Sequence, residues 1–166
     1  MKKIVLFLCG CLLFTAMTCT KDGADAHHHI KFYNTSNYDI YIERSFDHPD
    51  TSLSSIGDIT IPGWGNKVEA HSENNEALTD YMDDYEQMFI CEFDTLIVFV
   101  FTADSLDLYG LDYVKRNYLV SQRYDISLSD LQQLNWQLRF PPTEEMRNIK
   151  MWPPYGTYDA HGNKFE

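Results

Sequence analysis

The sequence predicts an α+β domain in which a mostly antiparallel β-sheet packs with two or three short helices. One observation is Thr95–Thr102, which contains six consecutive large apolar residues, most of them β-branched or aromatic, as in a buried strand. The other is that stretches of alternating apolar and polar residues occur together with stretches of helical apolar spacing. We expect roughly six to eight strands. A β-sandwich with helical insertions is the alternative.

The strand at Thr95–Thr102 is predicted to be central. Successive side chains of a strand point to opposite faces of its sheet. One face carries Leu96, Val98 and Val100, and the other carries Ile97, Phe99 and Phe101. Because both faces are apolar, protein has to cover both of them.

The N-terminus predicts export. Lys2 and Lys3 precede the apolar segment Ile4–Met17, which is shorter than the roughly 20 residues that span a bilayer as a helix. A charged start, a short apolar middle and small residues after it are typical of a signal peptide. Residues 1–18 are therefore predicted to be a lipoprotein signal peptide.

Cys19 is the predicted lipid-attachment residue. It follows Thr15-Ala16-Met17-Thr18, a loose version of the lipobox, in which a small residue precedes a cysteine that becomes diacylated. A second match ends at Cys11, but it would leave only Ile4–Leu8 as the apolar region. Cleavage by ordinary signal peptidase, without a lipid, is the alternative. With the leader removed, we expect Cys91 to form no intramolecular disulfide and to be a small buried side chain.

Residues 19–29 are predicted to be a flexible tether. The segment is small and polar, and it ends in His27-His28-His29. Three adjacent imidazoles offer ligands to a transition metal. A hydrophilic spacer between lipid and domain is the favoured interpretation, and we expect no metal site.

The globular domain is predicted at residues 30–142. Alternating residues predict a β-hairpin from Ile30–Tyr33 and Tyr38–Glu43, joined by an Asn-Thr-Ser-Asn turn. Short strands are further predicted over 56–61 and 67–70. Between them, Trp64 lies at the tip of a Gly-Trp-Gly turn. An exposed indole there would stack on a sugar or anchor a partner protein; the alternative is a Trp folded back over the core.

Residues 74–90 predict a helix, because apolar residues recur at helical spacing after Asn74 or Asn75 as N-cap. Its other surface is acidic, with Asp80, Asp83, Asp84 and Glu86, and we expect a solvated face. A calcium site is the alternative, but the glycine-containing loop of an EF-hand is lacking.

The second half of the domain predicts two helical regions, an extended segment and a final strand. Five features define it: a helical face over 104–118 capped by Asp104 and interrupted by Gly110, an extended segment over 120–126, a capping box at Ser127–Asp130, a short helix after it, and a half-buried strand over 136–140. Residues 143–166 are predicted to be a turn-rich tail.

Several of these stretches resemble one family. They are Ile97–Leu106, Arg123–Trp136, Phe140-Pro141-Pro142, Asn34–Asn37 and Pro49-Asp50-Thr51. Together they resemble a group of small uncharacterised lipoproteins of Bacteroidetes, over about two thirds of the chain. The resemblance implies a cell-envelope lipoprotein and brings no activity, substrate or catalytic residue. Within its most specific stretch, Arg123 and Asp125 lie two residues apart on one strand face, which favours an ion pair.

Charge excludes one class of partner. The chain has 25 acidic and 13 basic residues, with a formal net charge of −12. Such a surface repels nucleic acid and attracts cations and basic proteins. Nucleic-acid binding is therefore not expected.

We expect a non-catalytic lipoprotein of the cell envelope, anchored in the outer membrane by lipid on Cys19. No nucleophile elbow, zinc motif or phosphate loop is present, so no catalytic residue and no cofactor is predicted. The first hypothesis is a binding or accessory module for a glycan or surface component, using Trp64, Trp152 and Tyr155. The second is an acidic inhibitor or immunity-type protein that binds a basic protein. The third is a hydrolytic enzyme without a recognisable motif.

Overall fold

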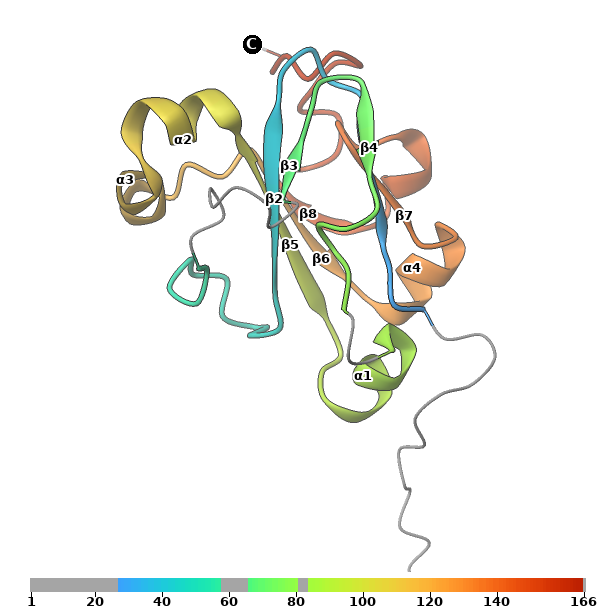
Figure 1. Cartoon of the computed structure of the whole chain (residues 1–166). Coiled ribbons are helices and arrows are strands. Elements are labelled where there is room, and N and C mark those ends of the chain that lie inside the picture. Colours follow the sequence, from blue (N-terminus) through green and yellow to red (C-terminus); the bar gives the residue numbers. More distant parts are fainter. Residues whose placement is uncertain (1–26, 58–65, 81–83, 166) are drawn as a thin grey trace, which may run out of the picture.

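The computed structural model describes residues 27–57, 66–80 and 84–165. This part of the chain forms eight strands and four α-helices, arranged as two mostly antiparallel sheets with helices beside them (Figure 1). The predicted α+β class is confirmed.

The five-stranded sheet has the order β3-β2-β5-β6-β8, and the three-stranded sheet has the order β4-β1-β7. The strands are β1 (Lys31–Asn34), β2 (Ile40–Ser45), β3 (Lys67–Val68), β4 (Ser72–Asn74), β5 (Leu96–Thr102), β6 (Gln122–Ile126), β7 (Gln137–Phe140) and β8 (Lys150–Trp152). The helices are α1 (Tyr85–Cys91), α2 (Ala103–Tyr109), α3 (Leu111–Asn117), α4 (Leu128–Gln133) and the 3-10 helix η1 (Glu144–Met146). All pairings are antiparallel except that of β1 with β7.

Strand β5 is central, as predicted. It pairs with β2 on one side and β6 on the other, and its six apolar side chains are fully buried. Leu96, Val98 and Val100 belong to a core shared with the three-stranded sheet, α1 and α4. The opposite face packs against α2, α3 and the loop around Leu53. Figure 1 shows α2 and α3 on one side of β5, with β7 and α4 on the other.

The predicted hairpin of the first two strands is wrong, because β1 and β2 belong to different sheets. The side chain of Asn34 explains the divergence. It is buried, its amide donates to the carbonyl oxygens of Tyr38, Val68 and Glu69, and its own oxygen accepts from Ser36. These bonds hold the turn to the β3–β4 corner, so β2 leaves β1 and pairs with β5.

The helix predicted over 74–90 is confirmed only at its C-terminal end, because among the described residues of this range, 74–80 and 84–90, the helix begins at Tyr85. The Asn74 side chain closes a turn by accepting from two following backbone N–H groups, and Asp84 is the N-cap. Asp80 is not part of a solvated helix face. Its carboxylate lies 3.2 Å from Arg44, whose guanidinium also donates to the Thr79 carbonyl oxygen.

Four α-helices are present among the described residues, where two or three were expected, since Gly110 separates α2 from α3. Gly110 has a φ of 73°, a left-handed conformation that favours glycine. The N-cap of α2 is Thr102, not Asp104: the Thr102 hydroxyl accepts from the backbone N–H of Ser105. The capping box of α4 is confirmed, with reciprocal bonds between Ser127 and Asp130.

The chain after residue 142 belongs to the core, which the predicted division into domain and tail did not anticipate. Met146 and Ile149 are buried, and β8 extends the five-stranded sheet beside β6. Their apolar side chains cover the end of the shared core, so this segment is part of the domain.

His27–His29 is not a free spacer, because backbone bonds join it to Thr79, Asp80 and Tyr85. Cys91 is exposed, contrary to the expectation of a small buried side chain. Cys19, Trp64 and most of the strand predicted over 56–61 lie outside the described residues.

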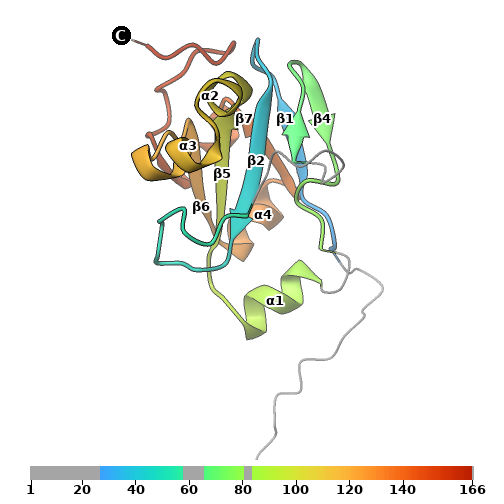
Figure 2. The same cartoon turned by 60° about the vertical axis from the view of Figure 1, so that its left-hand side comes forward.

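No helix within residues 27–57, 66–80 and 84–165 is long and apolar enough to cross a membrane. Figure 2 shows α1 at the end of the molecule where β5 begins, with α2 and α3 at the other end.

Replacing Phe99 tests the central position of β5. Phe99→Ala should lower the free energy of unfolding by about 3–5 kcal/mol, because it opens a cavity in a fully buried site. Leu108→Ala is the control, since this side chain is 71% exposed and its loss should change stability by only about 0.5 kcal/mol. Denaturant unfolding of both variants measures the difference. Equal stabilities would contradict a buried β5.

Candidate functional site

The outer face of the three-stranded sheet gathers polar and aromatic side chains. In β1, Phe32 is buried in the core while Lys31 and Tyr33 alternate with it and point outward, half-buried. Lys31 is in register with Gln137 of β7, and Tyr33 with Arg139 of β7 and Glu73 of β4. Residues in register share a face, so these five side chains form one continuous surface.

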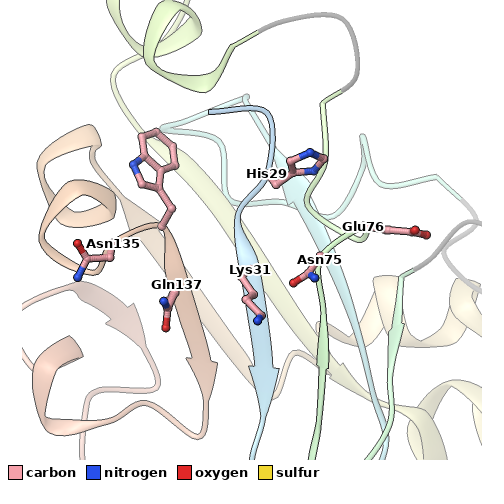
Figure 3. A pocket seen from close by; sticks show the side chains of 7 residues that line it. His29, Lys31, Asn75, Glu76, Asn135 and Gln137 are labelled. Carbon is pink, nitrogen blue, oxygen red and sulfur yellow. The ribbon is translucent and has the colours of Figure 1, made fainter. Parts of the chain in front are cut away.

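A pocket of about 570 Å³ opens at the end of this face where β1 begins. Its walls come from three separate segments of the chain: His29 and Lys31; Asn75 and Glu76; Asn135, Trp136 and Gln137. Figure 3 shows Lys31 on its strand between Gln137 on one side and Asn75 on the other. The pairing of β1 with both β4 and β7 therefore assembles the pocket.

Trp136 is positioned by the end of α4. Asn135 and Trp136 have φ values of 50° and 59°, a conformation that is uncommon for residues other than glycine. This turn lets the Trp136 N–H donate to the Leu131 carbonyl oxygen, at 2.8 Å, and directs the chain into β7. The indole is 9% exposed, so it supplies an apolar wall and not an open stacking surface.

The segment His27–His29 closes one side of the pocket. The imidazole of His27 stacks on the Trp136 ring with centroids 4.2 Å apart. Asp84 accepts a bond from the His27 backbone N–H, and His29 Nδ1 lies 2.8 Å from the Thr79 hydroxyl. These contacts fix His29 beside the pocket.

Charges on the face are mostly paired. Lys31 Nζ lies 2.9 Å from Glu73, and this hydrogen bond raises the pKa of the Lys31 ammonium. The guanidinium of Arg139 lies 4.3 Å from the centre of the Tyr33 ring, a cation–π distance. Arg139 forms no ion pair with any described carboxylate.

The chemistry of the pocket suits a ligand with many hydroxyl groups. Three amides, an imidazole, an ammonium and a carboxylate offer both donors and acceptors around an apolar wall. No nucleophile with an adjacent base lines it. Among the described residues, no group of three or more His, Cys, Asp or Glu side chains could hold a metal ion.

The structure places Trp152 and Tyr155, two of the three predicted binding residues, away from the pocket. Trp152 is on β8, 46% exposed, with its ring 5.7 Å from that of Tyr118. The Tyr155 hydroxyl donates to Glu144, and this bond raises the pKa of the Tyr155 phenol. Neither residue lines the pocket. Cys19 and Trp64 lie outside the described part of the chain.

The predicted pair of Arg123 and Asp125 is confirmed and is structural. Both nitrogens of the guanidinium fork contact the buried carboxylate, at 2.8 and 3.3 Å. Lys150 adds a third contact at 3.0 Å, and Tyr118 accepts from Arg123. The cluster ties β6 to β8 and to the end of α3.

The sequence did not indicate the pocket residues. Trp136 fits the alternating pattern that predicts a strand over 136–140, whereas in the structure it directly precedes β7. One signal was available: Asn135 follows a short helix, and Asn is among the few residues that readily take a left-handed conformation at such an end.

Comparison with family models, curated proteins and solved structures finds no match to this chain.

Removal of the Asp125 charge tests the structural role of the cluster. Asp125→Asn should lower the free energy of unfolding by about 3 kcal/mol, because it leaves Arg123 and Lys150 without a buried counter-charge. The control is Glu144→Gln, which removes the carboxylate of an exposed ion pair with Arg147 and should cost no more than about 1 kcal/mol. Urea unfolding at neutral pH compares the two. Equal losses would show that Asp125 contributes no more than a surface charge.

Proposed function

We propose that this protein is a non-catalytic lipoprotein of the cell envelope that binds a glycan in the pocket formed by β1, β7 and the segment after β4. The observation that carries the proposal is the pocket itself. It places three amide side chains and Glu76 around an apolar indole wall. Ligand sites commonly combine such an apolar wall with a few convergent polar groups.

The pocket fits one or two sugar rings. Its volume of about 570 Å³ lies within the ordinary range for small-ligand sites. Amides and carboxylates suit sugars because each sugar hydroxyl both donates and accepts a hydrogen bond. The segments that position these groups are held by sheet pairing and by the capped helix α4, so the site is largely formed before a ligand arrives.

The anchor is proposed from the sequence. Lipid on Cys19 would hold the protein to the membrane, and His27–His29 would lead from the tether directly to the pocket. The pocket would then lie at the anchored end of the domain.

A second candidate is favoured by one observation, the excess of acidic over basic residues. In that case the protein binds a basic protein as an inhibitor or immunity factor. The two candidates differ in salt dependence, because hydrogen bonding and apolar contact with a neutral sugar are screened little by salt, whereas attraction between opposite charges is screened strongly.

Glycan binding is tested with the purified domain on an array of envelope and host glycans, followed by calorimetric titration of those bound. Asn135→Gly removes an amide while keeping the left-handed backbone, and Gln137→Ala removes a second amide. Each should weaken binding about fivefold to tenfold, as expected when one hydrogen bond of about 1 kcal/mol is lost.

Gln133→Ala is the matched control, since this exposed amide on α4 lies outside the pocket, and it should bind like the wild type. Binding of neutral glycans should change little between low and high salt. Unchanged affinity in both pocket variants contradicts the proposed site. Capture of a basic protein at low salt only, with no glycan bound, would favour the second candidate.

Lipid attachment is tested by growing cells with a labelled fatty-acid analogue. Wild-type protein should carry the label and Cys19→Ala should not, because diacylation requires that thiol. Cys11→Ala is the control and should remain labelled. Label that persists in Cys19→Ala, or disappears only in Cys11→Ala, would show that the anchor is assigned wrongly.

A further inference from the structure

We infer that the ligand is an extended acidic polysaccharide, rich in uronic acid, that lies along β1 with a carboxylate on Arg139. This inference rests on the proposed function and narrows its substrate class. It comes from a second pocket on the same sheet face, from the alignment of the two pockets along β1, and from the positive charge of Arg139 beside the second pocket.

The second pocket lies at the other end of the same sheet face. It has a volume of about 300 Å³ and is lined by Tyr33, Asn34, Thr35, His71, Ser72 and Glu73. Lys31 lines the first pocket, and Tyr33 and Thr35 line the second. These three residues alternate along the chain from β1 into the turn that follows it, so both pockets open on its outward side.

The two pockets are in line and close together. From Lys31 to Thr35 the chain advances four residues, which in an extended strand is about 13 Å. A short oligosaccharide covers that length, whereas a single sugar does not. Two pockets in line therefore point to a chain-like ligand.

Arg139 supplies a positive charge on this face. It is in register with Tyr33, which lines the second pocket, and its guanidinium lies against the Tyr33 ring without a described carboxylate partner. The other cation of this face, Lys31, is paired with Glu73. A guanidinium fork matches a carboxylate with two parallel hydrogen bonds. Glu76 disfavours an anionic group in the first pocket, so the acidic sugar belongs at Arg139.

An extended peptide fits this face less well. Peptides commonly bind a sheet by pairing with a free strand edge. Both edges of β1 are occupied, by β4 and by β7, and the face above β1 presents side chains only. Hydroxyl-rich sugar rings with regularly spaced carboxylates use such side chains directly.

The test uses galacturonic-acid oligomers as probes in calorimetric titration of the folded domain. The tetramer should bind at least about tenfold more tightly than the dimer, because only the tetramer reaches both pockets. Full methyl esterification of the tetramer, which removes its charge and keeps its length, should weaken binding about tenfold. Equal affinity for dimer and tetramer, or for acid and ester, would overturn the inference.

Two variants of Arg139 test whether its positive charge causes the preference for the acid over the ester. Arg139→Gln should bind acid and ester equally, whereas Arg139→Lys should keep part of the preference for the acid. Arg147→Gln is the matched control, an exposed cation on another segment, and should behave like the wild type. Glu73→Gln gives a measure that does not depend on Arg139: loss of a negative charge in the second pocket should tighten binding of the acid about threefold relative to binding of the ester.

The outcomes separate this inference from the proposed function. Binding of short neutral glycans that requires Asn135 and Gln137, without a preference for longer or charged glycans, would support the proposed function and refute the acidic polysaccharide. Galacturonide binding that depends on Arg139 but not on Asn135 or Gln137 would support the acidic site and refute the first pocket. Poly-glutamate bound as tightly as the tetramer would overturn the inference in favour of an acidic peptide.

Discussion

The structure depends on one constraint, the burial of both faces of β5. Leu96, Val98 and Val100 need one apolar layer, and Ile97, Phe99 and Phe101 need another. A single sheet cannot supply two layers, so the chain packs a second sheet with α1 and α4 on one side, and α2 and α3 on the other. Each fully buried apolar side chain contributes roughly 1.5–3 kcal/mol of gross burial energy, and β5 buries six of them in succession.

Asn34 determines which strands pair with β1 and therefore which side chains form the outer face of the three-stranded sheet. Its buried amide holds the turn after β1 to the backbone that joins β3 and β4. As a consequence β1 pairs with β4 and β7 and presents Lys31 and Tyr33 on an open face. A free hairpin of β1 and β2 would not bring Gln137 and Asn75 to the two sides of Lys31. The candidate site thus follows from satisfying one buried polar side chain.

The proposed ligand chemistry follows from the same arrangement. A formal net charge of −12 would by itself favour a basic partner. The face along β1 differs from the whole surface, because its acidic Glu73 is paired with Lys31 while Arg139 has no described acidic partner. A local group chosen by strand register can therefore recognise a ligand that the overall charge would repel. The negative surface repels an acidic ligand at long range, whereas Arg139 attracts it at contact distance. Salt distinguishes the two effects, because it screens the long-range repulsion more strongly.

The sequence by itself determined the α+β class, the central strand, the α4 capping box and the pairing of Arg123 with Asp125, because each follows from neighbours within a few residues. It misplaced the partner of β1, which depends on residues far away in the chain. It also misplaced the start of the helix predicted over 74–90 and the position of Trp136, where local turns and caps at Asn74, Asp84 and Asn135 override the apolar spacing. The pocket combines segments near residues 29, 75 and 136, so no local pattern contains it. Strand pairing decides which side chains share a face, and pairing is settled only when the core closes.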